Sequence, residues 1–245
     1  MKEVEEKILD AHVHLGPSGE WLPYLEPSVG AEEIIESMDE HGIEKAIVFA
    51  NPCVGDKYPE MNDQISEAVD DFPDRLIGFG RVDPRRGEEA VSEVERCSEM
   101  GMEGIKLHPY VETFRPDHPN FEKVFETVYE NDLILLPHTG DGFSAPGYWK
   151  TVLEERSDMK MILAHLNEGC ISVAEDHDNV FVDTSGTRVY MLEHAVEKIP
   201  DKLVFGSDHP YLNYEVQKTV VKAADITEKK KRNIFIDNLE DLLQR

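Results

Sequence analysis

Four histidines and one aspartate are the residues of this sequence whose types and spacing could do chemistry. His12 and His14 stand two residues apart in the segment Asp10-Ala11-His12-Val13-His14. If this segment is a strand, its two-residue period places both imidazoles on one face, where two neutral nitrogens can converge on one cation. Taken alone, such a pair is as consistent with a chance pattern or a structural pair as with a metal site.

The same kind of ending recurs after three later apolar runs. His138 follows Leu135-Leu136-Pro137, His165 follows Ile162-Leu163-Ala164, and Asp208 follows Val204-Phe205-Gly206-Ser207. One histidine in such a place is more often structural than a ligand, but five polar residues at equivalent strand ends are hard to explain in that way. Since catalytic residues gather at the carboxyl ends of barrel strands, the set predicts a divalent metal site, with zinc preferred and manganese or iron as alternatives.

The elements that must position these residues alternate along the chain. Short β-branched and aliphatic runs are separated by longer amphipathic stretches, a pattern typical of βα units around a parallel sheet. We expect strands at 7–13, 45–50, 76–82, 104–108, 133–138, 159–165, 180–183 and 203–207, and helices at 31–41, 60–71, 87–100, 121–130, 148–156, 168–177, 189–198, 216–224 and 228–242. Eight units without a GxGxxG turn after the first strand predict one (β/α)8 barrel domain over residues 1–245.

Composition limits the classes of partner. The 51 acidic and 25 basic residues give a net charge of -26, which would repel nucleic acid and anionic membranes. No apolar run approaches a membrane span, and the charged N-terminus lacks the pattern of a signal peptide. Cys53, Cys97 and Cys170 form no CxxC pattern, so we expect reduced thiols and a cytoplasmic protein.

With these motifs in view, the chain resembles the amidohydrolase superfamily over essentially its whole length. The resemblance is to the amidohydrolase-related branch that contains aminocarboxymuconate-semialdehyde decarboxylase and related hydrolases and hydratases. It is carried by Asp10-Ala11-His12-Val13-His14, Gly104-Ile105-Lys106-Leu107-His108-Pro109, His138, His165 and Gly206-Ser207-Asp208. The ordered set is more specific than any one of its members.

The resemblance implies roles for the five residues. His12, His14, His138 and Asp208 would bind a metal, and His165 would either bind a second metal or polarise the substrate. Asp208 would also exchange a proton with a metal-activated water, a role that suits a carboxylate beside a cation.

Lys106 raises the question of one metal ion or two. Binuclear amidohydrolases carry a carboxylated bridging lysine on the fourth strand, whereas the Lys-Leu-His-Pro form is common where one metal suffices, so we expect one ion. Lys106 and His108 would then face the pocket, with Lys106 able to hold a substrate carboxylate. Alternatively, Lys106 pairs with an acidic side chain of the scaffold.

Several further residues could contribute to the site, but each could equally well have a purely structural role. Arg81 could bind an anionic group or form a scaffold ion pair. Trp21 and Tyr24 could wall the pocket or anchor their loop. Three residues after the seventh predicted strand could line the mouth or cap a helix, namely Asp183, Ser185 and Arg188. We expect His209 to point away from its neighbour, and His41, His118, His177 and His194 to be surface or structural residues.

Four functions remain open. The first is a hydrolase that uses a metal-activated water on a C-N or C-O bond of a small polar or carboxylated substrate. The second, sharing the same fold and ligands, is a decarboxylase or hydratase of a small carboxylic acid. A TatD-type DNase is opposed by Lys106, where that family would offer a glutamate, and by the net charge. A non-catalytic barrel is opposed by the complete ligand set. Homodimers are common among such barrels, and we allow for one here.

Overall fold

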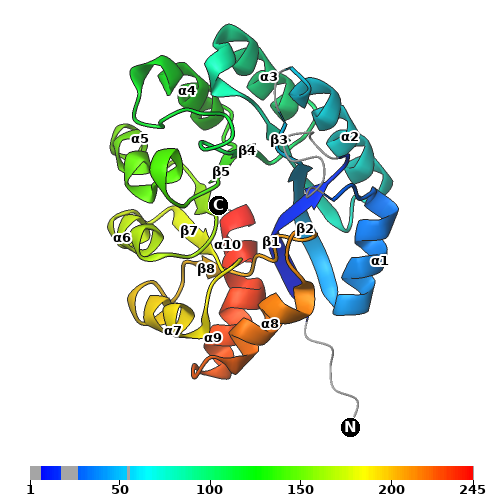
Figure 1. Ribbon diagram of the computed structural model, residues 1–245, viewed down its shortest axis with the longest axis vertical. Helices are drawn as coiled ribbons and strands as arrows, with labels where there is room; N and C mark the ends of the chain where they lie inside the picture. Colours follow the sequence, from blue (N-terminus) through cyan, green and yellow to red (C-terminus); the bar gives the residue numbers. More distant parts are fainter. Residues whose placement is uncertain (1–6, 18–26, 54–55, 245) are drawn as a thin grey trace.

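The computed structural model describes residues 7–17, 27–53 and 56–244, and its eight strands alternate with helices as the sequence predicted. In Figure 1 the helices form an outer ring around the strands. The strands are β1 Ile8–Leu15, β2 Ile43–Ala50, β3 Leu76–Arg81, β4 Gly104–Leu107, β5 Ile134–Pro137, β6 Met161–Leu163, β7 Val180–Asp183 and β8 Leu203–Val204. The α-helices are α1 Ala31–His41, α2 Tyr58–Asp71, α3 Glu88–Glu99, α4 Glu122–Glu130, α5 Trp149–Glu155, α6 Glu168–Asp176, α7 Val189–Lys198, α8 Tyr214–Ala223, α9 Glu228–Arg232 and α10 Asn238–Gln244.

The sheet follows the chain, with each strand parallel to the next from β1 to β8. Backbone hydrogen bonds then join its two edges. The amide of Ala11 donates to the carbonyl of Phe205 at 2.8 Å, and that of Asp208 donates to the carbonyl of His12 at 2.9 Å. The seam between the last and the first strand is therefore closed, and the (β/α)8 barrel that the sequence predicted is confirmed.

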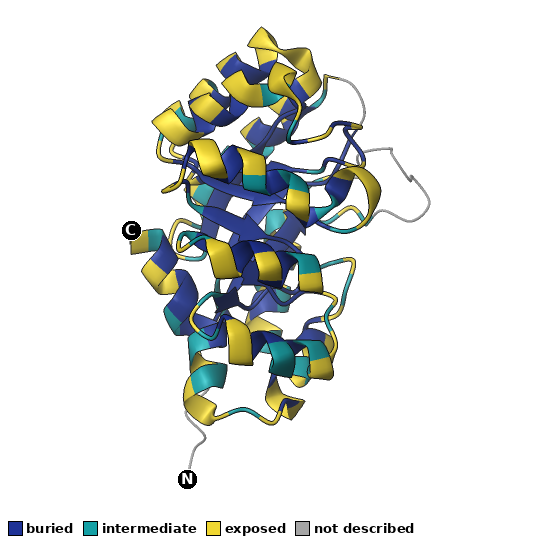
Figure 2. Cartoon of the chain, turned by 90° about the vertical axis from the view of Figure 1, so that its left-hand side faces the viewer, coloured by how far each residue is buried: buried dark blue, intermediate teal, exposed yellow. Residues whose placement is uncertain are grey.

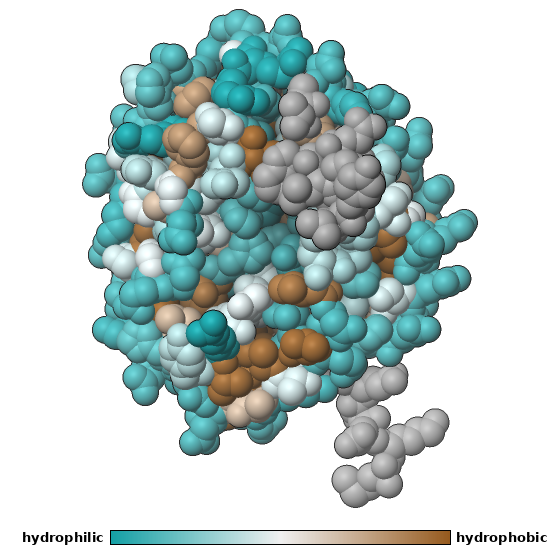
Figure 3. Space-filling model, in the orientation of Figure 1, coloured by the Kyte–Doolittle hydropathy of each residue, from teal (hydrophilic) through white to brown (hydrophobic). Residues whose placement is uncertain are grey.

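Burial explains why such short strands are stable. Every residue of β1 and β3 to β8 is buried, while the helices are buried only on the faces that pack on the strands. Figure 2 shows this division, with dark strands inside and exposed residues on the outer faces of the helices. Hydrophilic residues cover most of the described surface seen in Figure 3, as the acidic composition requires. Within the described residues, no helix combines the length and apolarity needed to cross a membrane.

The last predicted helix, 228–242, is interrupted. A π-helical segment, Asn233–Asp237, separates α9 from α10 and buries three consecutive residues, Ile234 to Ile236. The Ile234 carbonyl accepts a hydrogen bond from the Phe205 amide at 2.8 Å. This hydrogen bond ties the π-helical segment to the chain just after β8.

Candidate active site

The two histidines of β1 meet Asp208 in the mouth of the barrel. The Oδ1 atom of Asp208 lies 3.3 Å from His12 Nε2 and 3.2 Å from His14 Nε2. Two ligand atoms of a tetrahedral zinc site, each bonded at 2.0–2.1 Å, are about 3.3–3.4 Å apart. The three side chains thus have the donor types and the spacing that a divalent cation requires, and they form one of two His/Asp groups of this kind in the described structure.

Both imidazoles are in the protonation state that ligation needs. Burial, followed by the nearby Lys106 ammonium, lowers the pKa of His12 to about 4 and the pKa of His14 well below its usual value. Metal ligation requires a neutral imidazole with a bare nitrogen. These residues therefore fit a bound cation without first having to lose a proton at neutral pH.

The backbone at the mouth is strained in two places. Four non-glycine residues of the described segments have positive φ, and two of them are His165 (67°) and Asp208 (57°). A left-handed conformation costs a side-chain-bearing residue on the order of 1–3 kcal/mol, and such residues cluster at functional sites. With this backbone conformation, both side chains point from the ends of their strands toward His12 of β1.

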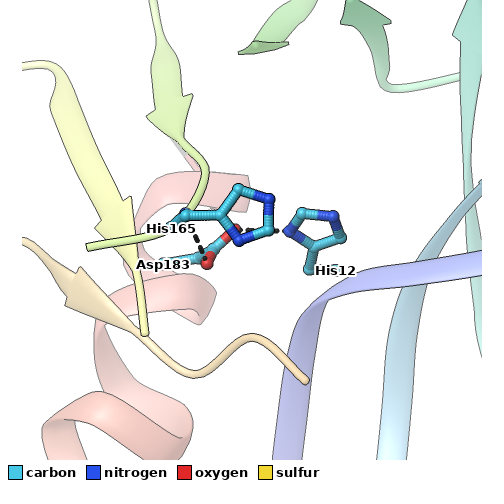
Figure 4. A group of neighbouring side chains, drawn as sticks. All are labelled: His12, His165 and Asp183. Atoms are coloured by element: carbon cyan, nitrogen blue, oxygen red, sulfur yellow. Dashed lines mark hydrogen bonds and ion pairs between the residues drawn. The ribbon is translucent and has the colours of Figure 1, made fainter. Parts of the chain in front are cut away.

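Asp183, at the end of β7, lies behind His12. Its Oδ2 atom is 2.7 Å from His12 Nδ1, and its Oδ1 atom accepts from the His165 amide at 3.1 Å and the Ser185 amide at 2.9 Å. Figure 4 shows His12, His165 and Asp183 converging from three different segments. Burial alone would raise the pKa of Asp183, but the charge and hydrogen bond of His12 outweigh it and hold that pKa well below its usual range.

The sequence left open whether Asp183, Ser185 and Arg188 line the mouth or cap a helix, and the structure differs among the three. Asp183 contacts His12, and the Ser185 hydroxyl lies 2.9 Å from His165 Nδ1, so both belong to the mouth. Arg188 is the exposed residue before α7 and makes no side-chain cap hydrogen bond.

His138 lies next to His165 and outside the His12–His14–Asp208 group. Its Nδ1 atom is 3.0 Å from His165 Nε2, and its ring stacks on His108 with 3.8 Å between centroids. Burial, followed by the neighbouring His108, lowers the pKa of His138 well below its usual value. His138 and His108 thus form a wall of the mouth, joined to the first group through His165.

Lys106 brings a buried ammonium to the same place. Its Nζ atom lies 3.3 Å from His12 Nε2 and 4.6 Å from the centre of the Phe49 ring. Within the described residues Lys106 forms no ion pair, so the scaffold pairing that the sequence left open is not observed. Burial, followed by Arg81, lowers the pKa of Lys106 to about 7.

Arg81 does form the scaffold ion pair that was its alternative. Its Nε atom lies 3.3 Å from Glu112 Oε1, which also accepts from the Tyr58 hydroxyl at 2.8 Å. The other carboxylate oxygen of Glu112 accepts from the His108 amide at 2.6 Å. Sequence reasoning missed Glu112, one of many acidic residues; the available signal was that a buried arginine needs a counter-charge nearby.

The remaining histidines and aromatic residues do not add to this group. The His209 ring stacks on Tyr214 with 4.4 Å between centroids, so it points away from Asp208 as its place in the strand predicted. His41 contacts the Ser37 carbonyl of its own helix, and His194 lies near Glu168 on the surface. Trp21 and Tyr24 lie outside the described residues. Cys53, Cys97 and Cys170 are buried free thiols.

The chain has known relatives in sequence and in fold. The chain matches the family model described as Amidohydrolase over residues 9–245. A curated relative, the 2-amino-3-carboxymuconate-6-semialdehyde decarboxylase of Dictyostelium discoideum, is 28% identical over 93 residues, which are 36% of this chain and only 26% of that protein.

Two solved structures show the same fold. One is a 2,6-dihydroxybenzoate decarboxylase from Rhizobium, with a TM-score of 0.80, 18% identity and 98% of each chain covered. The other is a 5-carboxyvanillate decarboxylase from Novosphingobium aromaticivorans with bound manganese, with a TM-score of 0.82, 17% identity and 97% of each chain covered. Because the family model spans nearly the whole chain, this protein belongs to the amidohydrolase family.

Proposed function

We propose that this protein is a metal-dependent enzyme that removes the carboxyl group of a small carboxylic acid. The observation that carries the proposal is the buried Lys106 ammonium, which has no ion-pair partner among the described residues and lies beside His12. An uncompensated buried charge is costly, and a substrate carboxylate would compensate it. The decarboxylases that share this fold support the choice of reaction.

The cation would be held by His12, His14 and Asp208, with His138 as the next ligand. Imidazole and carboxylate suit zinc, manganese and iron alike, and the manganese in one structural neighbour supports manganese beside zinc. When bound, the ion would polarise a substrate oxygen. We expect one ion rather than two, as the Lys106-Leu107-His108-Pro109 form favours.

Asp208 is the carboxylate best placed to move a proton. Its side chain is 16% exposed, whereas that of Asp183 is fully buried and bonded to several donors. Decarboxylation breaks a C-C bond, releases CO2 and leaves a carbon that must be protonated, and Asp208 would take a proton from solvent at its exposed edge and pass it to that carbon. His165 would orient its neighbours, and the stacked His108 and His138 would form the wall against which the substrate lies.

Hydrolysis of a C-N or C-O bond is the second candidate. The exposed part of Asp208 favours it, since a carboxylate in contact with solvent can take a proton from water. Arg81 is less suited than Lys106 to bind the substrate in either reaction, because Glu112 already neutralises its charge.

The test is a panel of small aromatic and aliphatic carboxylic acids, incubated with protein loaded with manganese or zinc and followed by carbon-13 NMR. Loss of the carboxylate carbon as CO2 is the expected result, whereas cleavage into two products that retain it would favour hydrolysis. Lys106→Met should raise KM for the active acid by about 10–100-fold, the value of one buried charge-assisted contact. Lys218→Met is a matched control, because Lys218 is also buried but its ammonium donates to the His41 carbonyl and pairs with Glu215, and none of these residues belongs to the candidate site. Equal KM values in the two variants would remove Lys106 from substrate binding.

A further inference from the structure

We propose that Asp183 and Ser185 are positioning residues that fix the tautomers of three mouth histidines. Through them His12 and His138 each keep a bare Nε2 atom that is able to bind a cation, an inference that rests on the metal site of the proposed function. Asp183 is fully buried, and the absence of a side chain on Gly206 leaves room for it, since a Cβ there would lie 2.9 Å from the Asp183 Cβ.

The first branch runs from Asp183 to His12. A carboxylate only accepts hydrogen bonds, so the proton in its 2.7 Å contact with His12 must lie on Nδ1. A neutral imidazole carries a single ring proton, which leaves His12 Nε2 bare. This is the atom that lies 3.3 Å from Asp208 Oδ1, in the mouth.

The second branch runs from Asp183 through Ser185 to His165. The Ser185 hydroxyl donates its only proton to Asp183 Oδ1, so Ser185 Oγ must be the acceptor in its 2.9 Å contact with His165 Nδ1. The backbone amides of His165 and Ser185 also donate to Oδ1 and hold the carboxylate in place. His165 is thereby the Nδ1–H tautomer, with a bare Nε2.

The series of hydrogen bonds continues from His165 to His138. With His165 Nε2 as acceptor, the 3.0 Å contact between the two rings requires a proton on His138 Nδ1. The Nε2 atom of His138 keeps its lone pair and can bind a cation. One carboxylate, buried in the scaffold, thus prepares ligand atoms on β1 and after β5, and partners of this kind are typically worth 10–100-fold in metal affinity.

The experiment reads tautomers directly in the metal-free protein. Long-range proton–nitrogen correlation spectra of nitrogen-15-labelled protein at pH 8, where an ordinary imidazole is neutral, show which ring nitrogen carries the proton. Single His→Gln variants at positions 12, 138 and 165 assign the signals. The wild type should show Nδ1–H for all three. Manganese and zinc affinities are measured by calorimetry on the same samples.

Three variants separate the branches. Ser185→Ala should release His165 and His138 into mixed tautomers, leave His12 unchanged, and weaken metal binding about 10-fold, whereas Asp183→Asn should disturb all three rings and weaken it about 10–100-fold. Ser144→Ala is the control, because the buried Ser144 hydroxyl has no hydrogen-bond partner among the described residues and its loss should change neither readout.

The proposal is overturned if wild-type His138 carries its proton on Nε2, or if Ser185→Ala weakens metal binding with every tautomer unchanged. If Asp183→Asn does not fold, the Ser185→Ala spectra still decide. Absence of carboxylic acid turnover would contradict the proposed function and leave these spectra as they are.

Discussion

The β3–β4 side of the mouth and the side formed by β7, β8 and β1 are both buried and both rich in ionisable groups, but they compensate charge differently. On the β7–β8–β1 side, Asp183 and Asp208 face imidazoles, and Asp183 is satisfied by several donors. On the β3–β4 side, Arg81 and Lys106 are paired in register on adjacent strands, and only Arg81 has a carboxylate partner.

The presence or absence of a carboxylate partner among the described residues distinguishes Arg81 from Lys106, although the two lie side by side on adjacent strands. A buried charge with a protein partner holds the fold together, as Glu112 does for Arg81 and the loop that carries His108. A buried charge without one, as Lys106 is among the described residues, is costly to the fold, and we propose that a substrate carboxylate compensates it. Substitutions on either side of the mouth can test this comparison.

The largest effect is expected at Asp208. Asp208→Asn removes the carboxylate that lies beside both His12 and His14 and to which we assign proton transfer. We therefore expect kcat to fall by at least about 10³-fold and bound metal to be lost. Metal content by plasma mass spectrometry and the unfolding curve check this prediction. Normal activity, or loss of activity through unfolding alone, would contradict it.

Breaking the compensated pair should chiefly affect stability. Glu112→Gln leaves the Arg81 guanidinium buried without its counter-charge and should lower the free energy of unfolding by about 3–5 kcal/mol. Urea unfolding of the metal-free protein measures it. If the double variant Arg81→Met/Glu112→Gln recovers none of the loss, the ion pair is not its cause.

Lys106 should make the free energy of unfolding depend on pH. Since the pKa of Lys106 is about 7 in the folded protein and about 10.5 when unfolded, the unfolded chain binds the extra proton between these values. The Lys106 contribution is therefore most destabilising below pH 7 and fades as pH rises toward 10.5, by about 1.4 kcal/mol per unit. The gain from Lys106→Met over wild type should shrink with that slope, and a gain that is constant with pH would argue for a normal lysine pKa.

The smallest effect is expected at the surface. Glu88 and Lys123 are an exposed pair whose Oε2 and Nζ atoms are 2.7 Å apart, shorter than the contact between Arg81 and Glu112. Glu88→Gln should nonetheless change the free energy of unfolding by less than about 0.5 kcal/mol, because solvent screens the pair. A loss as large as that of Glu112→Gln would show that distance, and not burial, governs these pairs.

The elements were largely predictable because each strand is a buried apolar run and each helix has one apolar face. α1 and α7 begin and end where the sequence predicted, and the strand ends that carry His138 and His165 differ by one or two residues. The π-helical segment was not predictable, since its Ile234 carbonyl accepts from the Phe205 amide just after β8, a tertiary contact that no local pattern encodes.

The candidate site was predictable only in part. Strand period and strand ends pointed to His12, His14 and Asp208, which lie together. The same reasoning could not tell that Lys106 lacks a partner among the described residues while Arg81 has one, because Glu112 reaches Arg81 from a loop whose path depends on tertiary contacts. The role of Asp183 was missed for the same reason, since its Oδ2 contact with His12 joins β7 to β1 across the barrel.

The seam of the barrel has a consequence for the order of events during synthesis. The hydrogen bond from the Asp208 amide to the His12 carbonyl joins the first strand to a segment that is synthesised only after all eight strands. A nascent chain that still lacks this segment also lacks the carboxylate of the proposed metal site. We therefore expect the cation to bind only after this segment has been made, and the bound cation would then hold β1 and the segment after β8 together.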